Sequence, residues 1–224
     1  MKILPITIDK DSHGSVIAPW VFTAVVTVLL QLFSCPVVLK WAVIAVLVLF
    51  SVLVTAFFRV PERVAAGDGC KVSSVADGEV VIVEKAYEDE FLKRECLRVC
   101  IYMDFFDVHA NFWPVCGEVI YNCYHPGRHI LAFKPKSSLF NEHATTAIRT
   151  AAGDEILFKQ IAGSFARRIE SYSTPGLKTV AGEQCGIIKL GSRIDIYLPA
   201  DASVLVSVGD KVRACETVIA ELKA

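Results

Sequence analysis

A long apolar segment dominates the first quarter of the chain. Residues 16–58 are almost wholly apolar, and only a few polar side chains near Pro36 interrupt them. One straight helix over this length would measure about 65 Å, roughly twice the hydrocarbon core of a bilayer. We therefore predict two membrane helices, over residues 16–33 and 41–58, folded back on each other as a hairpin.

Basic residues around this segment indicate its orientation. Lys40 lies between the two predicted helices, where its ammonium group can reach the headgroups instead of the costly bilayer centre. The outer ends are flanked by Lys2, Lys10, Arg59 and Arg63. By the positive-inside tendency we expect both ends on the cytoplasmic side of the cell membrane, although Lys40 opposes this. The hairpin either spans the bilayer or lies within one leaflet.

After residue 58 the pattern changes to short valine- and isoleucine-rich runs separated by Gly, Pro and Asp. Such runs predict β-strands joined by turns, and the best helix candidate covers residues 163–171. We expect a mostly β (α+β) chain, with an N-terminal tail and hydrophobic helical hairpin (1–58) followed by a β domain (59–224). The strand candidates are residues 79–84, 97–103, 118–121, 155–161, 186–189, 194–198 and 204–208.

A weak internal repeat links two parts of this domain. Residues 176–183 and 209–216 share Gly, Lys, Ala and Glu in register, and each is followed by an apolar run. The same order of turn and strand occurs in lipoyl- and biotinyl-type β-sandwiches, so we predict a duplicated, interlocked sandwich or barrel-like fold. Carrier domains of that type need a lysine at a hairpin tip, whereas the segment between the repeats contains Gly191-Ser192.

Composition narrows the partners and the chemistry. The chain has 23 Lys plus Arg against 24 Asp plus Glu, a balance that gives no support to a nucleic-acid partner. Its eight cysteines form no Cys-x-x-Cys pair, so we expect free thiols in a reducing compartment and no metal site. Four histidines are expected in turns or at the surface, namely His13, His125, His129 and His143.

The Gly191-Ser192 pair permits a specific reaction. A serine hydroxyl can attack the carbonyl of the preceding residue, and glycine leaves that carbonyl open on both faces. Elimination across the resulting ester breaks the chain and leaves dehydroalanine, which becomes a pyruvoyl group at the new N-terminus. Most Gly-Ser pairs are simple turns, so the pair alone does not demand this chemistry.

Ordered motifs cover nearly all of the β domain. They are Phe57-Phe58-Arg59-Val60-Pro61-Glu62-Arg63, Val75-Ala76-Asp77-Gly78-Glu79-Val80, Phe106-Asp107-Val108-His109-Ala110-Asn111 with Pro114 and Gly117, Asn141-Glu142-His143, Lys159-Gln160-Ile161-Ala162-Gly163 with Ala166-Arg167-Arg168-Ile169, and Gly186-Ile187-Ile188-Lys189-Leu190-Gly191-Ser192-Arg193. Together these motifs resemble the phosphatidylserine decarboxylase family, particularly its short bacterial and archaeal branch. Two positions depart from the family pattern, Val75 in place of Pro and His143 in place of Arg.

The resemblance implies a proenzyme that cleaves itself between Gly191 and Ser192. Ser192 would become the pyruvic acid cofactor, and the large (1–191) and small (192–224) chains would stay associated as a heterodimer, which can form higher oligomers. The family also suggests an Asp-His-Ser set that corresponds here to Asp77, His109 and Ser192. Phe112 stands where long-form relatives have a second histidine. Taken without the family, Asp77 fits a turn and His109 a structural histidine at a strand end.

The implied reaction belongs to the carboxy-lyases, a class of carbon-carbon lyases. Phosphatidylserine would form a Schiff base with the pyruvoyl group, lose carbon dioxide and leave as phosphatidylethanolamine. Arg167 and Arg168 are candidates for the lipid phosphate and Arg193 for the substrate carboxylate.

Three alternatives remain at this point. One is a membrane-anchored, lipoyl- or biotinyl-like β-sandwich adaptor that carries out no chemistry. The other two are pyruvoyl decarboxylases acting on archaetidylserine or on a soluble amino acid.

Overall fold

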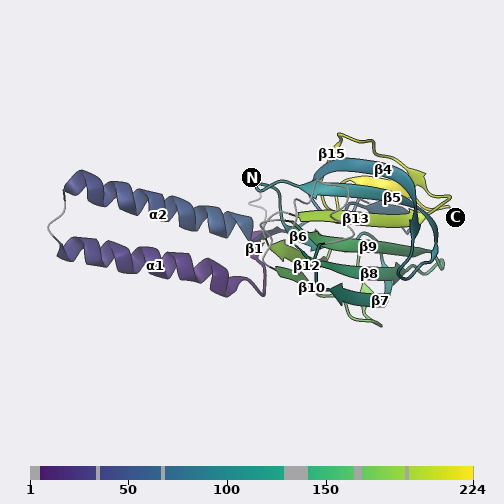
Figure 1. Cartoon of the computed structure of the whole chain (residues 1–224), viewed down its shortest axis with the longest axis horizontal. Helices are drawn as coiled ribbons and strands as arrows, with labels where there is room; N and C mark the ends of the chain where they lie inside the picture. Colours follow the sequence, from purple (N-terminus) through teal and green to yellow (C-terminus); the bar gives the residue numbers. More distant parts are fainter. Residues whose placement is uncertain are drawn as a thin grey trace. The chain divides into compact units, whose positions relative to one another are not determined.

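The structure is a computed structural model that describes residues 6–33, 36–66, 69–128, 141–163, 168–189 and 192–223. The chain divides into two compact units, Met1–Glu62 and Arg63–Ala224. The first unit contains two helices and a two-stranded sheet, and the second contains the remaining described strands (Figure 1). The predicted mostly β class with an N-terminal helical hairpin is therefore confirmed.

Two apolar helices make up most of the N-terminal unit. α1 (His13–Leu32) and α2 (Val37–Phe57) are long and apolar enough to cross a membrane. Each measures about 30 Å at 1.5 Å per residue, the thickness of a hydrocarbon core. α2 begins earlier than predicted, directly after Pro36, so Lys40 lies in its first turn. The unit is completed by β1 (Ile6–Ile8), which pairs with β2 (Arg59–Pro61) in antiparallel fashion.

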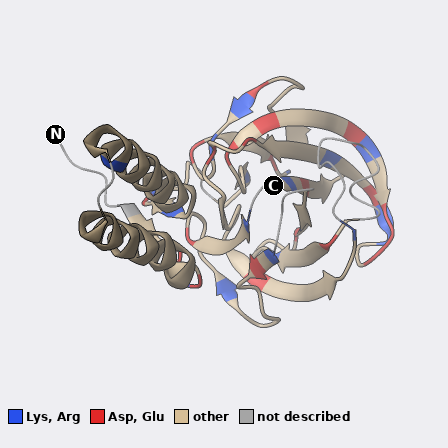
Figure 2. Ribbon diagram, turned by 60° about the vertical axis from the view of Figure 1, so that its left-hand side comes forward, with Lys and Arg blue, Asp and Glu red and all other residues tan. Residues whose placement is uncertain are grey.

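Small polar side chains join the two helices. The hydroxyl groups of Thr23 and Ser51 lie 3.0 Å apart, and the indole of Trp20 donates to Thr55 Oγ1 over 3.0 Å. Short hydroxyl side chains allow close backbone approach in an apolar environment, where interhelical hydrogen bonds have few competitors. Most of the large apolar side chains instead point outward, and Figure 2 shows Lys, Arg, Asp and Glu concentrated on the β unit.

The β unit is built on a curved eight-stranded sheet with the order β11-β7-β8-β9-β13-β5-β4-β15 (Figure 1). All of its neighbouring strands are antiparallel. The strands are β4 (Gly78–Glu88), β5 (Arg94–Met103), β7 (Gly117–His125), β8 (His143–Arg149), β9 (Glu155–Ala162), β11 (Lys178–Thr179), β13 (Ser192–Pro199) and β15 (Lys211–Val212).

Two three-stranded sheets accompany the large sheet, with the orders β10-β12-β6 and β14-β16-β3. Residues of all three sheets, such as Val72, Phe158, Ile188 and Ile194, share one hydrophobic core. Their strands are β3 (Lys71–Ser73), β6 (Ala110–Phe112), β10 (Arg168–Ser171), β12 (Gln184–Lys189), β14 (Ser203–Val204) and β16 (Val218–Glu221).

The strand orders confirm the predicted duplication. Reading the large sheet from its two edges, β11-β7-β8-β9 corresponds to β15-β4-β5-β13, and the small sheets correspond strand for strand. The repeated lysines, Lys178 and Lys211, start equivalent edge strands and pair with Glu118 and Glu79. One copy (β6 to β12) is inserted between β5 and β13 of the other copy, so the copies interlock.

A close backbone contact recurs in both copies. A Cβ atom on Gly78 would come within 2.2 Å of the Tyr102 carbonyl oxygen, and one on Gly117 within 2.4 Å of the Arg149 carbonyl oxygen. Any larger residue would push the strands apart, which accounts for the glycine that begins β4 and β7.

Two local predictions were wrong. The helix expected over residues 163–171 is replaced from Arg168 onward by β10, which pairs with β12, while residues 164–167 lie outside the described part. The strand expected over residues 204–208 is only β14, because the chain turns at residues 208–209. At β10, pairing with β12 overrides the local preference for a helix.

Candidate active site

Ser192 begins β13 at the point where the chain passes from one sheet to another. β12 before it belongs to a three-stranded sheet, whereas β13 is central in the large sheet. Ser192 is fully buried and lies opposite Met103 on β5 and Ala162 on β9. Leu190 and Gly191, which include the predicted cleavage residue, lie outside the described residues.

A line of buried polar groups leads away from Ser192. Its hydroxyl donates to Met103 Sδ over 2.9 Å, and Asn111 Nδ2 approaches the same sulfur at 3.9 Å. Gln160 Nε2 donates in turn to Asn111 Oδ1 over 2.9 Å. Among the described residues, the buried Oε1 atom of Gln160 has no hydrogen-bond partner. An unsatisfied buried carbonyl is costly and rare, so this atom is a candidate for contact with a bound molecule.

His109 lies directly before β6 and is fully buried. Its Nδ1 atom is 3.0 Å from the Asp107 carbonyl oxygen, which can only accept. In a neutral ring, Nδ1 therefore carries the proton, and Nε2 is the basic nitrogen that a general base uses. The His109 carbonyl accepts from Ile188 N over 3.3 Å, which fixes His109 beside β12, four residues before Ser192.

Asp77 lies in the turn before β4. Its carboxylate accepts two hydrogen bonds from the Arg63 guanidinium, one of them 2.7 Å long, and a third from Ala214 N over 2.9 Å. Burial raises the pKa of Asp107, and the negative charge of Asp77 raises it further. Asp77 therefore lies close enough to interact electrostatically with Asp107, whose carbonyl positions His109.

The three candidate arginines have different surroundings. Arg193 is fully buried, and its guanidinium donates to Asp195 and to Cys100 Sγ. Arg168 is exposed, forms an ion pair with Glu170 and lies opposite Lys189, close to the cleavage position. Arg167 lies outside the described residues.

A charged cluster at Glu90 packs against β7, β8 and β9. Glu90 accepts from Lys159 Nζ over 2.9 Å and contacts His125 Nε2 at 2.7 Å, and Glu88 also pairs with Lys159. Burial by itself would raise the pKa of Glu90, but hydrogen bonds from Lys159 and His125 outweigh it and lower that pKa to about 2.

Two of the histidines expected in turns or at the surface belong to this region. The rings of His125 and His143 stack at 4.5 Å on neighbouring strands, and both residues are half-buried. Burial lowers the pKa of His143. His125 also lies near Cys123 and Glu90, with ligand-type atoms within 4.8 Å of one another, and Lys159 supplies the positive charge at Glu90.

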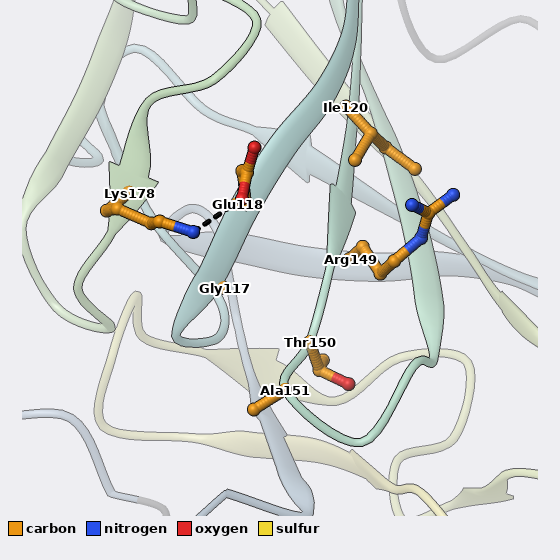
Figure 3. A pocket seen from close by; sticks show the side chains of 7 residues that line it. All are labelled: Gly117, Glu118, Ile120, Arg149, Thr150, Ala151 and Lys178. Carbon is orange, nitrogen blue, oxygen red and sulfur yellow. Dashed lines mark hydrogen bonds and ion pairs between the residues drawn. The ribbon is translucent and has the colours of Figure 1, made fainter.

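A pocket of about 400 Å³ lies at the end of the large sheet that is opposite to Ser192. It is lined by Gly117, Glu118, Arg149 and Lys178, among others, and the lysine pairs with the glutamate (Figure 3). In the duplicated fold this region corresponds to the strand ends around Gly78 and Met103. The pocket is therefore the counterpart of the Ser192 region in the other copy and contains none of the candidate catalytic residues.

Sequence reasoning proposed Ser192, His109 and Asp77 as site residues but did not propose four residues that lie near them. Arg63, Asn111 and Gln160 belong to the motifs of the family resemblance, so motif membership was an available signal. Met103 carried no such signal, because only the pairing of β5 with β13 brings it to Ser192.

Comparison with known proteins shows the family of the chain. Residues 50–220 match the model of the phosphatidylserine decarboxylase family. A phosphatidylserine decarboxylase proenzyme of Parabacteroides distasonis is 38% identical over 216 residues, 96% of this chain and 98% of the relative. Those of Nitrosomonas eutropha (40% over 207 residues, 91% and 93%) and Amoebophilus asiaticus (42% over 166 residues, 74% of each) are similar. The chain therefore belongs to the phosphatidylserine decarboxylase family.

Proposed function

We propose that this protein is a phosphatidylserine decarboxylase proenzyme that cleaves itself before Ser192 and then converts phosphatidylserine to phosphatidylethanolamine. The observation that carries the proposal is the buried position of Ser192 at the crossing between two sheets, in a chain of this family, with His109 hydrogen-bonded to β12 four residues before Ser192.

In the proposed self-cleavage, Ser192 Oγ attacks the Gly191 carbonyl carbon and the amide becomes an ester. Elimination then releases the Gly191 carboxylate and leaves dehydroalanine at position 192. Tautomerisation and hydrolysis consume one water, release ammonia and leave a pyruvoyl group at the start of the small chain. No external oxidant or reductant is needed, because the lost hydroxyl of serine balances the new ketone.

His109 is our candidate for the base that takes the Ser192 proton, since Nε2 is the unprotonated nitrogen of its neutral ring. Asp77 is assigned an indirect role. It holds Arg63 of the large chain and Ala214 of the small chain together and lies near Asp107, whose carbonyl orients the histidine.

The residues around Ser192 fit the pyruvoyl cofactor of the family. Among the described residues, the Ser192 hydroxyl donates to a weak acceptor, the Met103 thioether, so a methyl group in place of the hydroxyl would lose little there. When formed, the pyruvoyl ketone supplies an electrophile for the substrate amine and an electron sink as carbon dioxide leaves. Asn111 and Gln160 would orient the headgroup, and exposed Arg168 would meet its phosphate. Arg193 is buried and forms an ion pair with Asp195. We therefore assign it to holding β13 in place and not to binding the substrate carboxylate.

Two features support a membrane setting. The substrate is a bilayer lipid, and the chain has two helices of bilayer length. We propose that the hairpin anchors the protein with its β unit on the cytoplasmic side, and that the two chains remain together as a heterodimer.

Intact-mass measurement of the purified protein tests the proposal. We expect two chains that separate between residues 191 and 192, with the small chain carrying a pyruvoyl group and blocked to Edman degradation. Ser192→Ala should stay uncut and inactive, while Ser203→Ala, at an exposed serine of the same small chain, should be cut and active. A wild-type protein that stays in one piece and releases no carbon dioxide from phosphatidylserine vesicles would refute the proposal and favour a non-catalytic adaptor.

A further inference from the structure

Two aromatic side chains project from the turn that follows β5. Phe105 and Phe106 are 46% and 74% exposed, and their rings pack edge to face at 5.4 Å. The turn is well defined, because Asp107 N donates to the Asp104 carbonyl and Asp107 Oδ2 accepts from Asp104 N over 2.7 Å. The fold thus presents two large apolar rings on a turn that is held at both ends.

The duplicated fold contains an internal control for this feature. In the other copy, the turn after β8 closes in the same way, with Gly153 N donating to the Thr150 carbonyl. Its two central residues are Ala151 and Ala152. A turn of this type therefore forms without aromatic side chains.

The aromatic turn connects two parts of the candidate active site. Met103, just before it, contacts the Ser192 hydroxyl, and His109, just after it, is the proposed base. The two rings therefore lie on a short segment whose two ends both belong to the candidate active site. The counterpart turn with Ala151 and Ala152 is at the opposite end of the large sheet.

We propose that the Phe105–Phe106 turn enters the surface of the phospholipid bilayer and brings the headgroup of a membrane-embedded lipid to Ser192. This inference rests on the proposed function, because it concerns how the same site reaches a lipid substrate. Exposed aromatic rings are favourable at the boundary between headgroups and acyl chains.

Charges on the turn are compatible with this contact. The carboxylates of Asp104 and Asp107 accept hydrogen bonds from backbone N–H groups of the turn itself. Lys211 lies close enough to interact electrostatically with both. The acidic groups are therefore partly neutralised locally and leave the two rings as the outermost apolar feature of the turn.

The test compares one enzyme on two forms of the substrate. Full-length protein is reconstituted into phosphatidylcholine vesicles and supplied with long-chain phosphatidylserine in the same bilayer, or with a short-chain phosphatidylserine dissolved as monomers. The helical hairpin anchors every variant in the vesicles, so vesicle binding does not distinguish the variants. The measured quantity is therefore kcat/KM on the bilayer substrate compared with kcat/KM on the monomeric substrate. The variants are F105A/F106A, which copies the counterpart turn, F105L/F106L, which keeps apolar side chains, and Tyr87→Ala, an exposed aromatic at the far end of β4.

We expect F105A/F106A to cleave itself normally, to lose about tenfold or more in kcat/KM on the bilayer substrate and to stay within about twofold on the monomer. F105L/F106L and Tyr87→Ala should resemble the wild type on both substrates. An equal loss on both substrates would mean that the turn shapes the pocket, and no loss on either would mean that it contacts no lipid; both results overturn the inference. A wild type that is uncut, or inactive on both substrates, would instead refute the proposed function.

Discussion

At the scale of single residues, the least expected feature is the buried amide pair beside Ser192. Gln160 donates to Asn111, and its own carbonyl oxygen has no hydrogen-bond partner among the described residues. Leaving such an oxygen unsatisfied costs about 1–3 kcal/mol, which suggests that it is kept for the substrate or for the ammonia released during maturation.

Gln160→Met tests this role. The variant loses one buried hydrogen bond and one unsatisfied carbonyl, so we expect its melting temperature to change by less than about 3 °C. Self-cleaved Gln160→Met should nevertheless lose about tenfold or more in kcat, measured as carbon dioxide released from phosphatidylserine. Unchanged kcat in a fully cleaved preparation would exclude a role in decarboxylation.

The ion pair of Asp77 with Arg63 allows structure and chemistry to be separated. Both side chains are largely buried, so either Asp77→Asn or Arg63→Met should lower the free energy of unfolding by about 3 kcal/mol. If Asp77 also supports His109, Asp77→Asn should slow self-cleavage more than Arg63→Met of similar stability. Cleavage is followed by gel shift well below the melting temperatures.

Glu216→Gln serves as the matched control, because Glu216 also faces Arg63 but at 3.9 Å and half exposed. We expect this variant to change stability by less than about 1 kcal/mol and to cleave at the wild-type rate. Equal cleavage rates in Asp77→Asn and Arg63→Met would show that Asp77 contributes to stability and does not support His109.

Residues whose type suggests chemistry could be proposed as site residues from the sequence, whereas a neighbour such as Met103 could not. Ser192 and His109 were proposed because glycine-serine cleavage and histidine base chemistry need those residue types within the family motifs. Met103 is an ordinary apolar strand residue in the sequence, and its place at the Ser192 hydroxyl depends on strand register. Register follows from the packing of whole strands, which short sequence patterns do not specify.

At the scale of elements, the tip of the β4–β5 hairpin is held by charge. Glu90 contacts Lys159 on β9, His125 on β7 and Thr145 on β8, so one carboxylate ties the tip to three strands. A folded-state pKa of about 2 against an ordinary 4.5 means that the ionised form favours folding. This contribution is present above about pH 4.5 and is lost as the pH falls towards 2.

Glu90→Gln should remove that contribution. Because the group is partly solvated, we expect a loss of about 2 kcal/mol at pH 7, or a melting temperature lower by roughly 5 °C. The difference from wild type should shrink below pH 4.5, since the wild-type carboxylate then becomes protonated as well. Differential scanning fluorimetry in detergent from pH 7 to pH 3 measures both, and a pH-independent difference would contradict the assignment.

Elements differ in how well the sequence predicts them. The two helices were predicted because an uninterrupted apolar segment of bilayer length has few other solutions. Most of the long strands were found from their β-branched runs, but β8 was missed because its sequence, His-Ala-Thr-Thr-Ala-Ile-Arg, contains no valine and one isoleucine. β3, β6, β11 and β15 are too short to show a period of two. β10 was mistaken for a helix because its partner β12 lies at a distance in the chain.

For the whole molecule, the interlocked duplication explains how a cleaved chain can keep its fold. The repeated Gly, Lys, Ala and Glu positions were enough to predict two copies. In the structure, each repeated lysine forms an ion pair with a glutamate on the neighbouring strand of its own copy. The strand orders could not be predicted, because they arise from inserting one copy into the other. The proposed self-cleavage would fall at the junction where the chain re-enters the first copy.

After cleavage, the small chain would still supply the central strand of the large sheet. β13 pairs along its length with β5 and with β9, both from the large chain, and its Ile194 and Ile196 are fully buried. The small chain also provides β15, β16 and the Ala214 N–H bound by Asp77. Separating the chains would therefore break sheets and expose core, which amounts to unfolding the β unit.

We therefore expect the two chains to behave as one protein. With an affinity tag on the large chain, the small chain should co-purify in mild detergent even at molar sodium chloride, because buried backbone pairing and apolar contacts are insensitive to screening. It should be released only at the denaturant concentration at which the β-sheet circular dichroism signal is lost. Loss of the small chain in salt, with that signal intact, would show that β13 is not held as the sheet predicts.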